Sequence, residues 1–168
     1  GKAIGLIGTH VDDDLIAGSK EFFANQVAKL RKMHVYGKWH YIDDGFHHCG
    51  RHLRRNEKGE VLCGQKDYTA SLEKIPLSNE RRKVKESKIT EAERQALHSG
   101  NGQIQWFVKS TCMDLAFQLA ESQARAHDEA ATMQDLLDFN KMVSDAKTDM
   151  VEITFKKIDL SEAAIVAI

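Results

Sequence analysis

Residues 10–18 read His-Val-Asp-Asp-Asp-Leu-Ile-Ala-Gly, and Thr9 alone separates them from the apolar run Ala3-Ile4-Gly5-Leu6-Ile7-Gly8. Apolar segments on both sides of a short acidic cluster indicate two strands joined by a turn. We therefore expect a β-hairpin with arms over residues 3–11 and 14–18 and the acidic residues at its tip. Carboxylates are preferred ligands of hard divalent cations such as Mg²⁺, so Asp12 and Asp13 are the first candidate metal ligands.

The acidic tip has two interpretations, a metal site or a plain turn. Adjacent carboxylates repel one another unless a cation or a basic group is near, which favours a metal, whereas aspartate is also common in turns for local hydrogen-bonding reasons. A second pair occurs in Tyr41-Ile42-Asp43-Asp44. No apolar strand precedes that pair and Gly45 follows it, so we expect Asp43 and Asp44 to form a turn and not a metal site.

The composition is that of an ordinary globular protein and limits how the chain could bind nucleic acid. The 168 residues suffice for one domain or two small ones, with 42% hydrophobic and 29% charged residues. The formal net charge is −1, so binding to nucleic acid would use local basic patches. The cysteines number 3, without a Cys-x-x-Cys pair, which indicates an intracellular, reducing compartment. No apolar run reaches the roughly 18 residues of a membrane span.

Hydrophobic spacing and turn residues predict the elements of the first half. Ser19 is a candidate N-cap of a helix that extends to about His34, and a loop is expected over residues 36–44. A second hairpin follows, with arms Phe46–Arg54 and Glu60–Gly64 around the turn Asn56-Glu57-Lys58-Gly59. A short helix is expected over residues 66–72, before Pro76.

The second half is predicted to be mainly helical. Residues 78–89 contain almost no apolar side chains, which predicts a solvated linker. Thr90 and Glu93 have the spacing of a capping box and predict a short helix that ends at Gly100-Asn101-Gly102. Further helices are expected over residues 103–126 and 130–147. A strand pattern returns near Val151, Ile153 and Phe155, and another strand is expected over the last nine residues.

The acidic hairpin is the first of several short motifs along residues 4–145. It comprises Gly8-Thr9-His10-Val11-Asp12-Asp13-Asp14-Leu15-Ile16-Ala17-Gly18. The others are, in order, Phe46-x-x-Cys49-Gly50-Arg51, Gly59-Glu60-Val61-Leu62-x-x-Gln65-Lys66-Asp67-Tyr68, Ile75-Pro76-Leu77, Gly102-Gln103-Ile104-Gln105-Trp106 and Asp114-Leu115-Ala116-Phe117. In this order they resemble the Tyr-Val-Asp-Asp-x-Leu-Ile-Ala-Gly segment, and the motifs after it, of copia-type retrotransposon reverse transcriptases.

The resemblance implies an α+β fold built from parts of a polymerase. It implies a partial palm of hairpins and a helix over residues 1–76, a charged linker over 77–89 and a thumb-like helical bundle over 90–149. Residues 150–168 would connect toward an RNase H-like domain, because Phe155-x-x-Ile158-Asp159-Leu160 is similar to the approach to that domain.

The resemblance also implies a reaction and its site residues. Asp12 and Asp13 would be catalytic and would bind Mg²⁺, with Asp12 the stronger candidate for a direct ligand. Two such ions stabilise the attacking and leaving oxygens in nucleotidyl transfer. The partners would be an RNA or DNA template–primer duplex and a deoxynucleoside triphosphate, and the hairpin over residues 46–64 would resemble a primer grip.

Several departures from the family pattern bear on activity. His10 stands where the family has Tyr, and Cys112-Met113 stand where it has Arg-Pro, so a cation is lost. The family's third palm carboxylate and its fingers lie upstream of Gly1. Since the chain begins without Met and ends on an apolar run over residues 163–168, we expect a piece of a longer polypeptide that does not polymerise DNA alone. The alternative is a domesticated, non-catalytic scaffold bound to other protein subunits.

Basic, histidine and tryptophan residues supply secondary candidates. Arg51, Arg54, Arg55 and Lys58 could contact phosphates, which give affinity without sequence information. The linker has further basic residues for which a solvated loop is an equal alternative; they are Arg81, Arg82, Lys83, Lys85 and Lys88.

The second hairpin also contains residue types that zinc binds, with Cys63 in its later arm. Strand alternation predicts His47 and Cys49 on one face and His48 and His52 on the other, which favours a polar hairpin over a zinc site. Trp39 and Trp106 are expected to be packing residues.

Overall fold

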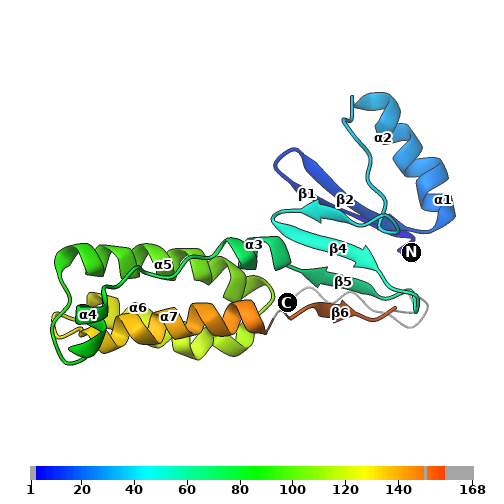
Figure 1. Cartoon of the computed structure of the whole chain (residues 1–168). Coiled ribbons are helices and arrows are strands. Elements are labelled where there is room, and N and C mark those ends of the chain that lie inside the picture. Colours follow the sequence, from blue (N-terminus) through cyan, green and yellow to red (C-terminus); the bar gives the residue numbers. More distant parts are fainter. Residues whose placement is uncertain (1–2, 150, 158–168) are drawn as a thin grey trace. The chain divides into compact units, whose positions relative to one another are not determined.

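The computed structural model describes residues 3–149 and 151–157, in which short strands and helices are combined (Figure 1). The elements of the first half are β1 (Gly5–His10), β2 (Asp13–Gly18), α1 (Lys20–Phe22), the π-helix η1 (Phe23–Val27), α2 (Ala28–Met33), β3 (Phe46–His48), β4 (Arg51–Arg55) and β5 (Val61–Gly64). Those of the second half are α3 (Lys66–Ser71), α4 (Asn79–Lys83), α5 (Glu91–Ser110), the 3₁₀-helix η2 (Met113–Leu115), α6 (Ala116–His127), α7 (Met133–Thr148) and β6 (Ile153–Phe155). The predicted α+β class is confirmed at this level.

The chain divides into two compact units, which are described separately. The first takes in the described residues of Gly1–Leu62 and Thr154–Ile168, and the second those of Cys63–Ile153. The strands form a two-stranded sheet, β1-β2, and a four-stranded sheet in the order β3-β4-β5-β6. The boundary that we predicted after residue 76 falls inside the second unit. The strand predicted over the last nine residues lies outside the described residues.

The predicted acidic hairpin is present as β1 and β2. The strands pair antiparallel from Gly5↔Gly18 to His10↔Asp13, which leaves Val11 and Asp12 as the turn. Phe22 packs over the opposite end of the hairpin, where a Cβ atom at Gly5 or at Gly18 would collide with its ring. The absence of a side chain at both glycines therefore allows the helix that follows to pack directly on the hairpin.

The helix predicted from Ser19 to His34 is present but contains a π-helical segment. Ser19 is its N-cap, and the Ser19 side chain accepts a hydrogen bond from the Phe22 backbone amide at 3.1 Å. The π-helix η1 separates α1 from α2. Because its hydrogen bonds join residues five apart, it brings Phe22 and Val27 toward the same face, and these side chains are only 8% and 2% exposed.

The predicted strand Phe46–Arg54 is wrong, because this segment is itself a hairpin. β3 and β4 pair through Phe46↔Leu53, His47↔His52 and His48↔Arg51. The turn residues Cys49 and Gly50 both have positive φ, at 48° and 70°, and cysteine gives no sequence signal for that conformation. The second turn, at Asn56, is as predicted.

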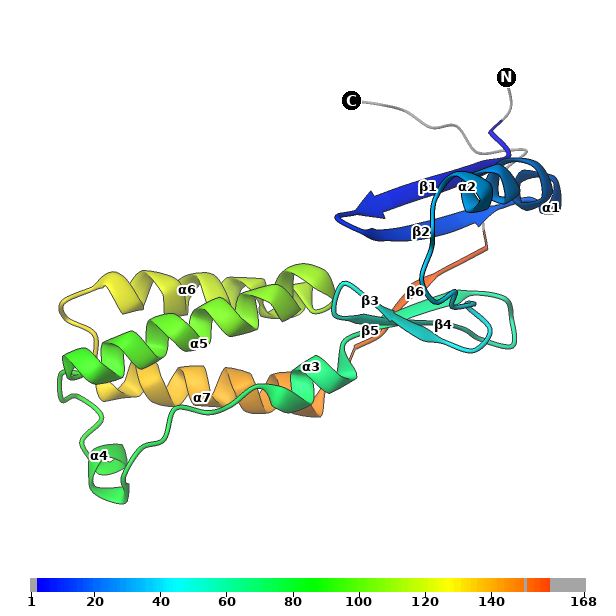
Figure 2. The same ribbon diagram turned by 90° about the horizontal axis from the view of Figure 1, so that it is seen from above.

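The helices α5, α6 and α7 lie side by side and enclose the main core of the second unit (Figures 1 and 2). Its most deeply buried large side chains include Leu97, Ile104, Phe107, Met133, Leu136 and Phe139. The predicted capping box of Thr90 and Glu93 is confirmed, and Thr132 with Asp135 forms a second one.

The helix break predicted at Gly100-Asn101-Gly102 is wrong, because α5 continues through it. Gly100 lies under the ring of Phe139, with which a Cβ atom there would collide. The helix ends instead at Ser110, with Thr111 as its C-cap, before η2, so the predicted helix over residues 103–126 is divided in two.

The segment over residues 78–89, predicted to be a solvated linker, is mostly exposed, but it contains the short helix α4 and makes specific tertiary contacts. Ser78 caps α4, and the guanidinium group of Arg81 donates hydrogen bonds to both carboxylate oxygens of Glu93 at 3.0 and 2.7 Å. The Met133 amide donates to the Ser87 carbonyl at 2.9 Å, and Ile89 is in the core at 8% exposed. These partners lie in other parts of the chain, so composition could not reveal them.

Candidate functional site

The acidic tip is a tight turn that presents two carboxylates to solvent. Of its two central residues, only Val11 has a positive φ, at 58°, which is the sign pattern of a type II′ turn and an unusual conformation for a β-branched residue. The side chains of Asp12 and Asp13 are exposed, and no ion pair joins either to another described residue. The negative charge at the tip is therefore not compensated within the described part of the chain.

Asp14 differs from its neighbours because hydroxyl groups bind both of its carboxylate oxygens. Its Oδ1 accepts a hydrogen bond from Thr9 Oγ1 at 2.7 Å, and its Oδ2 accepts one from the Tyr36 hydroxyl at 3.1 Å. Desolvation, and then the hydrogen bond and the charge of Asp14, raise the pKa of Tyr36 above its ordinary value. The phenol thus remains a donor at neutral pH. Sequence reasoning missed Tyr36, because 22 residues separate it from Asp14.

The tip offers ligands of the right chemistry for Mg²⁺ but not a closed cage. Among the described residues there is no group of three or more His, Cys, Asp and Glu side chains that could hold a metal ion. Mg²⁺ is commonly held by one or two carboxylates together with waters and substrate phosphates. Asp12 and Asp13 fit that pattern as part of a coordination shell, and other ligands would have to complete it.

The four basic residues predicted to bind nucleic acid do not form one surface. Side chains alternate along β4, which places Arg51 and Arg55 on one face and Arg54 on the other. Lys58 belongs to the next turn. Arg55 is also paired with Asp43, with 3.0 Å between Nη1 and Oδ1. The predicted turn at Asp43 and Asp44 is present.

The predicted distribution of histidines over the second hairpin is wrong, because the chain reverses at Cys49-Gly50. His47 and His52 are directly opposite each other across β3 and β4, with ring centroids 4.9 Å apart. They are only two potential ligands at one place, and no third His, Cys, Asp or Glu among the described residues completes a metal group with them.

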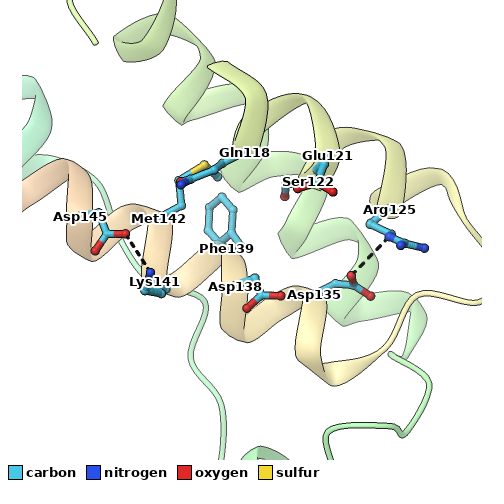
Figure 3. Close-up of a pocket in the computed structure, with 10 residues that line it drawn as sticks. All are labelled: Gln118, Glu121, Ser122, Arg125, Asp135, Asp138, Phe139, Lys141, Met142 and Asp145. Atoms are coloured by element: carbon cyan, nitrogen blue, oxygen red, sulfur yellow. Dashed lines mark ion pairs between the residues drawn. The ribbon is translucent and has the colours of Figure 1, made fainter. Parts of the chain in front are cut away.

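The bundle of the second unit presents an acidic groove between α6 and α7 (Figure 3). Its volume is about 320 Å³, and its acidic residues are Glu121, Asp135, Asp138 and Asp145. The two basic residues in the groove are both paired, Arg125 with Asp135 at 3.8 Å and Lys141 with Asp145 at 3.6 Å. This face would repel nucleic-acid phosphates.

Two other predicted residues have different surroundings from those expected. Arg81, a candidate phosphate contact, is instead paired with Glu93. Trp106, expected to be a packing residue, is 42% exposed.

Comparison of the chain with known proteins gives no match: no protein-family model matches it, and neither does a curated protein or a solved structure. Within the described residues, no helix combines the length and the apolar character that crossing a bilayer requires. Cys49, Cys63 and Cys112 form no disulfide.

Proposed function

We propose that the chain is part of a copia-type RNA-directed DNA polymerase, in which the β1–β2 hairpin contributes to a two-metal nucleotidyl-transfer site. The observation that carries the proposal is the pair Asp12 and Asp13 at an exposed hairpin tip, without ion pairs to other described residues. Adjacent carboxylates repel each other, and a divalent cation would relieve this repulsion.

The roles of the individual residues follow from their positions on the hairpin. Asp12, in the turn, would be the direct metal ligand, and Asp13, at the start of β2, would be the second. Thr9 and Tyr36 hold the carboxylate of Asp14 by hydrogen bonds, so Asp14 would support the hairpin and not bind the ion. Bound Mg²⁺ would supply Lewis-acid stabilisation of the attacking and leaving oxygens. The third carboxylate and the fingers would come from sequence outside these 168 residues.

The proposed setting includes a template–primer duplex, a deoxynucleoside triphosphate and an intracellular, reducing compartment. Because Arg51, Arg54, Arg55 and Lys58 do not share one face, we propose that only a subset of them contacts the duplex backbone. Arg55 is already paired with Asp43, with 3.0 Å between Nη1 and Oδ1.

A second candidate function is a non-catalytic scaffold within a larger protein assembly. The observation that favours it is the acidic groove between α6 and α7, because a thumb that follows a duplex would carry basic side chains. In this case the acidic tip would have no catalytic role, and the second unit would bind protein.

Paramagnetic NMR with Mn²⁺ as a substitute for Mg²⁺ tests whether the hairpin tip binds a divalent cation, as the polymerase function requires and the scaffold function does not. At low Mn²⁺ concentration we expect selective broadening of the amide signals of residues 9–14 in the 168-residue chain. Asp12→Asn should abolish this broadening. The matched control is Asp44→Asn, which removes one carboxylate from the other acidic turn and should leave the effect intact. Equal broadening at both turns, or no change in Asp12→Asn, would contradict the polymerase proposal.

A further inference from the structure

The first unit contains a pocket of basic and aromatic side chains, which the end of α2 and the loop after it form. It has a volume of about 430 Å³ and is lined by Arg31, Lys32, His34, Tyr36 and Trp39, together with the apolar Met33 and Val35. None of these residues is acidic, although the whole chain has a formal net charge of −1. The hollow is open, because the side chains of Met33 and Val35 are 73% and 105% exposed, and its basic and aromatic lining favours an anion with a planar group.

The aromatic side chains of this pocket are arranged in contact with one another. The guanidinium carbon of Arg31 lies 3.7 Å from the ring centroid of Trp39, which is a cation–π contact. The ring of Tyr36 meets Trp39 at 60° with centroids 5.2 Å apart, and His34 meets Tyr36 at 77° and 6.3 Å. Arg31 is exposed and Trp39 is half-buried. A planar ligand can therefore stack on a guanidinium plane that is already positioned.

A hydrogen bond connects this pocket to the acidic hairpin. The Tyr36 hydroxyl donates to Asp14 Oδ2 at 3.1 Å, and Asp14 itself does not line the pocket. The loop after α2 has no regular secondary structure, so this bond and the ring contacts fix the position of Tyr36. The pocket and the hairpin belong to the same unit.

We propose that the pocket binds a nucleotide of single-stranded nucleic acid, with its base stacked on the Arg31–Trp39 pair and its phosphates contacting Lys32 and Arg31. Arginine planes and aromatic rings are the surfaces on which unpaired bases stack. A duplex fits less well, because its own stacking covers the faces of its bases. The place of this pocket in a polymerase rests on the proposed function, whereas the binding itself needs no metal ion.

The experiment uses a thymidine decamer as the probe, in the presence of EDTA so that the hairpin holds no metal. Trp106→Phe leaves Trp39 as the remaining one of the 2 tryptophans, and we expect the decamer to quench its fluorescence. An abasic decamer has the same phosphates without bases, and it should bind about tenfold more weakly if a single base stacks. Anisotropy of a labelled decamer with the unaltered chain gives the same affinities independently of Trp106→Phe.

Matched variants test whether the pocket, and not general charge, is responsible. Arg31→Gln should weaken decamer binding by about tenfold, the effect of losing one stacked base. Lys29→Gln removes one positive charge from the same helix at an exposed position outside the pocket, and it should change the affinity less than about twofold, as one screened surface charge does. Asp12→Asn should bind the decamer normally in EDTA, so this test is independent of the Mn²⁺ experiment.

Several outcomes would overturn the proposal. Equal affinity for the thymidine and the abasic decamer would show that charge alone binds the strand. Equal effects of Arg31→Gln and Lys29→Gln would place the binding elsewhere. Equally tight binding of a deca-glutamate peptide would indicate a protein ligand, and unchanged Trp39 fluorescence in the bound state would exclude stacking at this pocket.

Discussion

At Gly100 the absence of a side chain allows α5 and α7 to pack closely. A Cβ atom there would collide with the ring of Phe139, which is 2% exposed and cannot move into solvent. We expect Gly100→Ala to lower the free energy of unfolding by about 1–3 kcal/mol through overpacking, although alanine favours a helix by about 1 kcal/mol over glycine. Urea unfolding followed by circular dichroism measures this change.

Gly102 in the same helix is the matched control for that substitution. Nothing lies within 4 Å of a Cβ atom built at Gly102, so Gly102→Ala should stabilise the chain by up to about 1 kcal/mol through helix propensity alone. If Gly100→Ala stabilised the chain as much as Gly102→Ala, the Phe139 ring would have to be free to move, contrary to its burial.

At the scale of the element, an ion pair links the start of α5 to α4 and makes stability depend on pH. Hydrogen bonds from Arg81 are the largest cause of a pKa of Glu93 below its ordinary value, and hydrogen bonds from Thr90 also contribute. A lowered folded-state pKa stabilises the chain above the unfolded-state pKa, and this stabilisation is lost as pH falls through the folded-state value. We therefore expect a fall in the unfolding midpoint temperature below about pH 4.

Glu93→Gln tests this pH dependence, because glutamine preserves a capping box while removing the charge. The variant should be less stable than the unaltered chain at pH 7 and should lose less stability between pH 7 and pH 3. The control is Glu91→Gln in the same helical turn, where the side chain is 72% exposed and its pair with Arg94 is long, at 3.7 Å. The same pH profile for Glu93→Gln and the unaltered chain would contradict this assignment.

At the scale of the whole molecule, burial is distributed unequally between the two units. The main core cluster lies in the second unit, whereas Phe22 and Val27 are the buried apolar residues among the described part of the first. Regions with few buried apolar contacts open at lower free energy. In native-state hydrogen exchange, we expect amides in the middle of α5 and α7 to exchange far more slowly than those of β1 and β2. Equal protection in both units would contradict this expectation.

The elements that sequence predicted correctly depend on neighbours a few residues away. Ser19 caps the helix after the hairpin, and Thr90 with Glu93 starts α5, because each cap joins residues three apart. The same holds for the hairpin itself and for the placement of Asp12 and Asp13 at its tip, since strand, turn and strand are continuous in the chain. The polymerase role of this pair remains a prediction, because geometry places charges without identifying their ligand.

The features that only the tertiary structure revealed depend on contacts between residues that are distant in sequence. A side chain is excluded at Gly100 because the ring of Phe139 comes from another helix, and Arg81, in the segment 78–89, meets Glu93 of α5. The contact of Tyr36 with Asp14 likewise appears only when the loop after α2 returns to the hairpin. Local patterns therefore determined the acidic hairpin and the helix starts. Long-range packing decided the need for glycine at position 100, the contacts made by residues 78–89 and the hydrogen bond between Tyr36 and Asp14, because these features require groups that sequence spacing does not bring together.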